Sequence, residues 1–67
     1  PGILVFDIPR GQTILNVKVN RKLKAIKAKK IQNSVWKSDN LQELIKIAIW
    51  IRNAGGKAKV LEEKVIF

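Results

Sequence analysis

The chain has 67 residues, of which fourteen are lysine or arginine and five are aspartate or glutamate, so its formal net charge is +9. It contains neither cysteine nor histidine, which excludes disulfides, thiolate zinc sites and catalysis by imidazole. Apolar residues make up 46% of the sequence, so we expect a folded core rather than a disordered basic tail. One domain over residues 1–67 follows from this length, and a core this small favours an oligomer. There is no apolar stretch long enough for a membrane span and no recognisable secretory signal, so we expect a cytoplasmic protein.

The first part of the chain predicts a strand and a helix. Residues 3–8 form a short apolar run, typical of a strand buried on both faces, and the proline that follows ends it. Residues 12–27 fit a strand as well as a helix, because some apolar residues alternate with polar ones. The helical spacing runs further along the chain, at Leu15, Val19, Leu23 and Ile26. We therefore expect a helix over residues 13–27, with Thr13 as its N-cap.

The remainder predicts a strand, a second helix and a last strand. Residues 29–37 are rich in β-branched and aromatic side chains, which favours one strand kinked near Asn33, or an extra strand near Trp36. Residues 41–54 carry a wide apolar face and stop at two glycines. Residues 57–67 form the final predicted strand, with Ala58, Val60, Val65 and Phe67 as its apolar positions.

The start of the second helix and the fold class follow from the same pattern. Asn40 and Glu43 have the spacing of a capping box, so Glu43 is best explained as part of the cap. The element order predicts an α+β fold, a ferredoxin-like (split βαβ) antiparallel sheet with two helices on one face. The broad apolar face of the second helix and the last strand should bury part of a dimer contact.

The positive charge is concentrated between residues 18 and 37, where eight basic residues occur with no acidic one. Such a field attracts polyanions, and phosphate contacts supply most non-specific affinity for nucleic acid. The alternative is a lysine-rich solvated face of the kind found in heat-stable proteins. We favour nucleic-acid binding, with Ser34 as a phosphate ligand and Trp36 as a stacking platform, although a single tryptophan is more often a core or interface residue. The predicted basic contacts are Arg10, Arg21, Lys22, Lys24, Lys29 and Lys30.

Asp7 is the one acid in the first predicted strand. A buried carboxylate costs free energy unless it is paired or binds a cation. The structural interpretation is that Asp7 caps the next helix or pairs with a lysine or arginine. The functional interpretation is a Mg²⁺ ligand, since Mg²⁺ takes one or two carboxylates and keeps several waters. A two-fold dimer could bring two copies of Asp7 to one ion, which would activate water and screen phosphate charge.

Two segments resemble a known family. The segment Val5–Pro9, Val-Phe-Asp-Ile-Pro, resembles the Tyr-Asp-Ile-Pro signature that opens the small CRISPR-associated adaptation proteins. The segment Ile31–Trp36, Ile-Gln-Asn-Ser-Val-Trp, resembles the Val-Gln-Asn-Ser-Val-Phe strand of the same family, and residues 19–30 match the helix between them. The resemblance covers about residues 3–54. Lys37 stands where the family usually has glutamate, and the hairpin that follows is shorter.

The resemblance implies a ferredoxin-like homodimer that processes nucleic acid during spacer acquisition. Asp7 would be the catalytic residue and the Mg²⁺ ligand in phosphodiester cleavage of RNA or double-stranded DNA. Ser34 and Trp36 match the family's serine and aromatic, of which the serine lies near the active cleft. The dimer would also bridge subunits of the CRISPR integrase and hold DNA by its backbone without cleaving it.

Two other functions stay open from the sequence. A basic nucleic-acid-binding module without catalysis explains the charge equally well, and it leaves Asp7 without a chemical role. A small tautomerase would use the amine of Pro1 as a general base, aided by an arginine. The segment 31–36 has no place in that second alternative.

Overall fold

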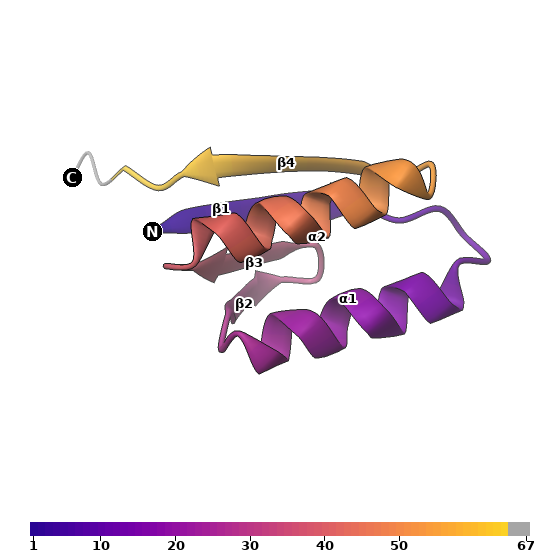
Figure 1. Cartoon of the computed structure of the whole chain (residues 1–67), viewed down its shortest axis with the longest axis horizontal. Coiled ribbons are helices and arrows are strands. Elements are labelled where there is room, and N and C mark those ends of the chain that lie inside the picture. Colours follow the sequence, from indigo (N-terminus) through magenta and orange to yellow (C-terminus); the bar gives the residue numbers. More distant parts are fainter. Residues whose placement is uncertain (65–67) are drawn as a thin grey trace.

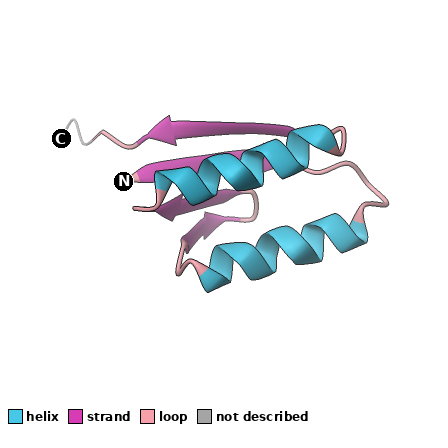
Figure 2. Ribbon diagram, viewed as in Figure 1, coloured by secondary structure: helices cyan, strands magenta, loops and turns pink. Residues whose placement is uncertain are grey.

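The computed structural model describes residues 1–64 and shows an α+β fold with one four-stranded antiparallel sheet. The elements are β1 (Gly2–Asp7), α1 (Thr13–Ala25), β2 (Lys29–Gln32), β3 (Val35–Ser38), α2 (Leu41–Asn53) and β4 (Lys57–Glu62) (Figure 1). The strand order is β2-β3-β1-β4, and both helices lie on one face of the sheet (Figure 2). This arrangement confirms the predicted ferredoxin-like fold. Among the described residues, no helix has the length and apolar character needed to cross a membrane.

The core lies between the helices and one face of the sheet. Its buried side chains come from two strands and two helices that are distant in sequence, namely Leu4, Phe6, Val19, Leu23, Trp36, Leu44, Ile47, Ala48 and Ile51. Along β1 the side chains alternate, so Leu4 and Phe6 face the core while Val5 is 37% exposed and Asp7 is exposed. The prediction that the first strand is buried on both faces was wrong, because the helices of one chain cover only one face of the sheet.

Helix α1 matches the predicted range to within two residues at its end. Thr13 is its first residue rather than its N-cap, which is Gln12. The Gln12 side chain does not cap the helix; its Nε2 instead donates to the carbonyl oxygen of Ala54 at 2.8 Å. That bond joins the start of α1 to the end of α2, two points that are 42 residues apart in sequence.

The predicted strand over residues 29–37 is two strands, as the alternative with an extra strand near Trp36 proposed. The chain reverses at Asn33 and Ser34, and β2 then pairs antiparallel with β3. A register shift lies between Lys30 and Gln32. The kink expected at Asn33 is therefore the turn of a hairpin, because two-residue connections are enough to join antiparallel strands.

Helix α2 also begins and ends where expected. The Asn40 Oδ1 accepts a hydrogen bond from the Glu43 backbone N–H at 3.3 Å, so the predicted cap is confirmed on the asparagine side. At the other end Gly55 has φ +90°, and the Gly56 N–H donates to the Ile51 carbonyl oxygen at 2.9 Å, which is a Schellman motif. The predicted last strand is present as Lys57–Glu62, and its portion over 65–67 lies outside the described residues.

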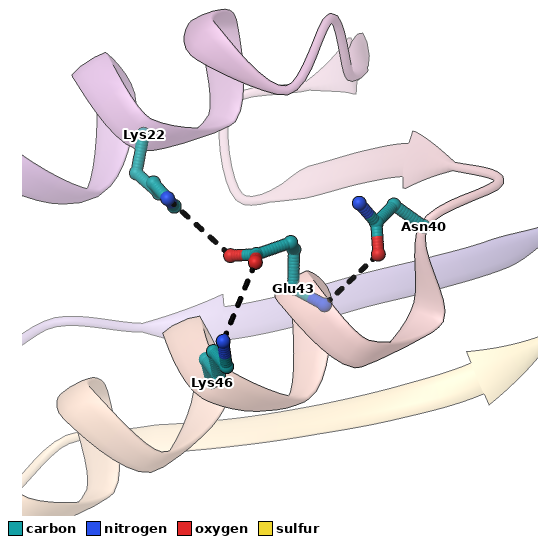
Figure 3. A network of polar contacts seen from close by, with 4 residues as sticks. All are labelled: Lys22, Asn40, Glu43 and Lys46. Carbon is teal, nitrogen blue, oxygen red and sulfur yellow. Dashed lines mark hydrogen bonds and ion pairs between the residues drawn. The ribbon is translucent and has the colours of Figure 1, made fainter.

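The Glu43 side chain joins the two helices instead of completing the capping box (Figure 3). Its Oε2 lies 3.4 Å from Lys22 Nζ on α1, and its Oε1 lies 3.5 Å from Lys46 Nζ on α2. The Asn40 N–H that a capping box would satisfy donates instead to Ser38 Oγ at 3.0 Å. Burial alone raises the pKa of the Glu43 carboxyl, but the hydrogen bond and charge of Lys22, with those of Lys46, hold it below its ordinary 4.5.

Replacing Glu43 by glutamine should make the free energy of unfolding change less as the pH falls into the acidic range. Because the folded-state pKa is lower than the unfolded one, the charged carboxylate stabilises the fold above pH 4.5, and this contribution is lost as the pH falls through the folded-state pKa. The free energy of unfolding of E43Q, from urea denaturation, should therefore be lower than that of the wild type at neutral pH and converge with it in acid. Glu62 makes no ion pair within residues 1–64, so E62Q serves as the control and should not show this convergence.

Candidate nucleic-acid interface

Asp7 lies at the mouth of a polar depression of about 370 Å³ where β1 ends. Three elements meet there, because β1 runs antiparallel to β3 and its end therefore lies beside the β2–β3 turn. The Phe6 N–H donates to the Ser34 carbonyl oxygen at 3.1 Å and fixes this contact. Helix α1 supplies the remaining wall. The lining residues are Phe6, Asp7, Ile8, Asn16, Asn20, Lys30, Asn33 and Ser34.

Asp7 takes neither of the structural roles considered from the sequence. The residue at the N-cap of α1 is Gln12, and within residues 1–64 Asp7 makes no ion pair. Its cross-strand neighbour on β4 is Lys57. Its backbone packs closely, since a Cβ added at Gly56 would lie 2.7 Å from the Asp7 carbonyl oxygen. The strand end is thus held in place by its main chain, while the carboxylate is exposed to solvent.

A second depression, of about 380 Å³, adjoins the first along α1. Its lining includes Arg21 and Lys24, and it shares Asn16 and Asn20 with the depression at Asp7. We call the two together the basic groove. Arg21, Lys24 and Lys30 are exposed, and none of them makes an ion pair with another described residue. The structure therefore brings these three predicted contacts together with Ser34 and Asp7.

Other predicted contacts lie apart from the basic groove. Lys22 is engaged with Glu43 between the helices, and Arg10 follows β1 without lining either depression. Lys29 is exposed on the edge strand β2, next to Lys30, and extends the positive surface beyond the groove. Trp36 is 2% exposed and belongs to the core, so its ring has no free face for a base. The stacking role predicted for Trp36 was wrong, because the Trp36 side chain on β3 faces the helices and is buried in the core.

Asn16 and Asn20 are the residues of the groove that the sequence did not single out. They are four residues apart and so share one face of α1. The sequence did show two asparagines on the polar side of a helix whose buried positions are Val19 and Leu23. It was too weak to interpret, because exposed asparagines on a helix have no specific chemical meaning until the neighbouring strand end is placed beside them.

The donors for a metal ion are few in one chain. Asp7 is the only acid that lines the depression, where Ser34 and the asparagines add neutral oxygens. The described residues contain no cluster of three or more acidic, histidine or cysteine side chains. One carboxylate with waters is at the lower limit of what Mg²⁺ accepts in proteins. The site fits Mg²⁺ only if a second copy of the chain contributes its own Asp7.

Several apolar surfaces of the described residues are uncovered, including one at Ile14 and Val17 on α1, and two others bear on the proposed dimer. On the sheet face that the helices leave open, Ile3 pairs with Leu61 and Val5 pairs with Val35, which forms an apolar patch beside Asp7. On α2, an exposed stripe runs along Leu41, Ile45 and Ile49, next to β4. The second surface is the one from which the sequence predicted a dimer contact.

No family model, curated protein or solved structure matches this chain. Function is therefore inferred from the geometry of the basic groove.

Proposed function

We propose that this protein binds nucleic acid along the basic groove. Arg21, Lys24 and Lys30 are exposed cations without an acidic partner among the described residues, and this observation carries the proposal. Where a lysine serves the fold, it is paired, as Lys37 is with Glu63 at 2.8 Å. Unpaired cations along a groove supply the phosphate contacts that dominate nucleic-acid affinity.

The wider role we propose is that of the CRISPR adaptation proteins: a cytoplasmic homodimer that contacts the integrase subunit and holds nucleic acid. The ferredoxin-like fold supports it, as does the position of both resembling segments. Residues 5–9 include the end of β1, and residues 31–36 form the hairpin beside it, so the two segments meet at one depression. The antiparallel pairing of β1 with β3 is what brings these two segments together.

Mg²⁺-dependent phosphodiester cleavage is the second candidate, and the exposed, unpaired Asp7 favours it. A shared Mg²⁺ would activate a water molecule and offset phosphate charge. Strands rise about 3.4 Å per residue, so a two-fold axis beside Val5 would separate the two Asp7 residues by about 14 Å along the strands. The axis must therefore pass next to Asp7 for the pair to hold one ion. A nucleic-acid-binding module without catalysis needs no such axis.

The tautomerase alternative finds no support in the arrangement of the chain. Pro1 precedes β1, whereas Arg10 and Arg52 lie toward the other end of that strand, since Arg10 follows β1 and the end of α2 packs on Asp7 through Gly56 (Figure 1). The Pro1 carbonyl oxygen accepts a hydrogen bond from the Glu63 N–H at 2.9 Å, a backbone contact with no acid–base role.

Binding should weaken steeply with salt, because phosphate contacts release counterions. Fluorescence anisotropy over a salt series measures the slope of log K against log salt. The double variant Lys24→Gln/Lys30→Gln should lower that slope by about 1 for each lysine removed. Lys57→Gln/Lys59→Gln removes the same charge from β4, and its slope should stay nearer that of the wild type. A flat salt dependence of the wild type contradicts the proposal.

Asp7→Asn separates cleavage from binding. If two Asp7 carboxylates hold Mg²⁺, cleavage of RNA or duplex DNA by the wild type should require Mg²⁺ and should be lost in D7N. Anisotropy in the absence of metal should show that D7N still binds. Asp39→Asn is the matched control, because Asp39 is exposed and lies outside the basic groove. A wild type that cuts neither substrate with Mg²⁺ leaves the binding function and removes the catalytic one.

Light scattering tests whether a dimer uses the open sheet face or the apolar stripe of α2. A dimer in which the two Asp7 residues meet must use the open sheet face, because Asp7 and Val5 lie on it. Val5→Lys should then give monomers, whereas Ile49→Lys should not. The opposite result assigns the dimer to α2 and β4, as the sequence predicted, and excludes a shared ion. A wild type that is monomeric at micromolar concentration contradicts both.

A further inference from the structure

Asn16 and Asn20 form a pair whose orientation is fixed within α1. The two hydrogens of Asn20 Nδ2 are donated to the Asn16 carbonyl oxygen at 2.8 Å and to Asn16 Oδ1 at 3.0 Å. An asparagine amide has two donor hydrogens and one acceptor oxygen, so these bonds use all the donors of Asn20. Within residues 1–64, Asn20 Oδ1 and Asn16 Nδ2 have no further hydrogen-bond partner. The pair thus keeps the Asn20 Oδ1 acceptor and the two N–H donors of Asn16 Nδ2 free for a ligand.

The opposite wall of the depression adds groups of both kinds. Asn33 can donate and accept, Ser34 can do the same, and Lys30 only donates. Asp7 lies at the rim, where it carries the one negative charge among the lining residues, and its side chain belongs to the open sheet face. A ligand that fits this wall must therefore both donate and accept hydrogen bonds, and it must tolerate a carboxylate.

A phosphate group does not meet these requirements. Lys30 and Ser34 would attract it, but it accepts hydrogen bonds almost exclusively, so it leaves the Asn20 Oδ1 without a donor and lies near the charge of Asp7. The edge of a nucleobase meets them, because donors and acceptors stand side by side on it and it is uncharged. Asparagine is among the residues that bind such an edge through paired hydrogen bonds.

Resting on the nucleic-acid binding proposed above, we propose that the depression at Asp7 receives one unpaired nucleobase, recognised by Asn16 and Asn20. The phosphates on either side of that nucleotide then lie along Arg21 and Lys24 in the adjoining depression. The volume of about 370 Å³ is at the lower end of the range for small-ligand sites, which suits one base. A base held in a duplex has its edge paired and its faces stacked, so it cannot enter. The preferred ligand is single-stranded RNA or DNA.

The test compares single-stranded and duplex oligonucleotides of one sequence by anisotropy, in EDTA so that Asp7 binds no metal. The wild type should bind the single strand at least tenfold more tightly than the duplex. Asn20→Ala and Asn16→Ala should each reduce single-strand affinity by about tenfold, the lower end of the effect of a paired base contact. Both should leave duplex affinity unchanged. A series of homopolymers then shows which base is preferred.

Two controls make the outcomes separable. Asn53→Ala removes an exposed asparagine from α2, outside the basic groove, and should change nothing. Asn16 is exposed, so its variant should unfold at the wild-type temperature even if the half-buried Asn20 variant is less stable. If the wild type binds no nucleic acid, the proposed function itself fails. If it binds single strand and duplex equally, or if both variants keep the wild-type ratio, the base pocket is wrong while nucleic-acid binding stands.

Discussion

The alternation of side chains along β1 is the constraint on which the rest of the site depends. Leu4 and Phe6 must face the helices, because they fill the centre of the core. A strand has a period of two residues, so Val5 and Asp7 are then placed on the opposite face. This alternation keeps the Asp7 carboxylate in solvent and places Val5 in an apolar patch beside it. A shift of one residue would bury Asp7 and expose Phe6, and the core would not tolerate it.

The charges divide into a structural set and a free set, and this division gives the surface its chemistry. Two of the five acids hold cations in place: Glu43 pairs with Lys22 and Lys46, and Glu63 pairs with Lys37. Lys18 lies with its Nζ 4.5 Å from the centroid of the Trp50 ring, another contact that fixes a cation against the fold. Of the cations that line the basic groove, Arg21 and Lys24 have neither an acidic nor an aromatic partner among the described residues, whereas Lys30 Nζ lies 6.0 Å from the centroid of the Trp36 ring. The basic groove therefore carries cations without acidic partners among the described residues, and Lys57 and Lys59 on β4 are further exposed cations outside it.

Much of the fold could be predicted because its signals are local. The spacing of apolar residues, the Asn40 cap and the two glycines place α2 almost to the residue. The errors occurred where tertiary contacts decide. Whether β1 is covered on both faces depends on where the helices pack, which no segment encodes by itself. From the sequence a single tryptophan favours a core or interface position over a stacking platform, and the pairing of β3 with β1 decides for the core. The spacing of Glu43 fits a capping box, yet its carboxylate forms an ion pair with Lys22 of the other helix.

The residues of the site also differ in whether local sequence or tertiary contacts reveal them. Asp7, Ser34 and the lysines were recognisable by residue type and by neighbours in sequence, but Asn16 and Asn20 were not. Their meaning arises only when α1 packs against the end of β1, which converts two ordinary helix amides into the wall of a polar depression. This placement also explains why the depression and the cationic surface differ in chemistry although they adjoin. Phosphates are attracted by charge and need little geometry, whereas a base edge must be matched atom by atom. Fixed amides beside a strand end serve the second purpose, and flexible lysines on an exposed helix serve the first.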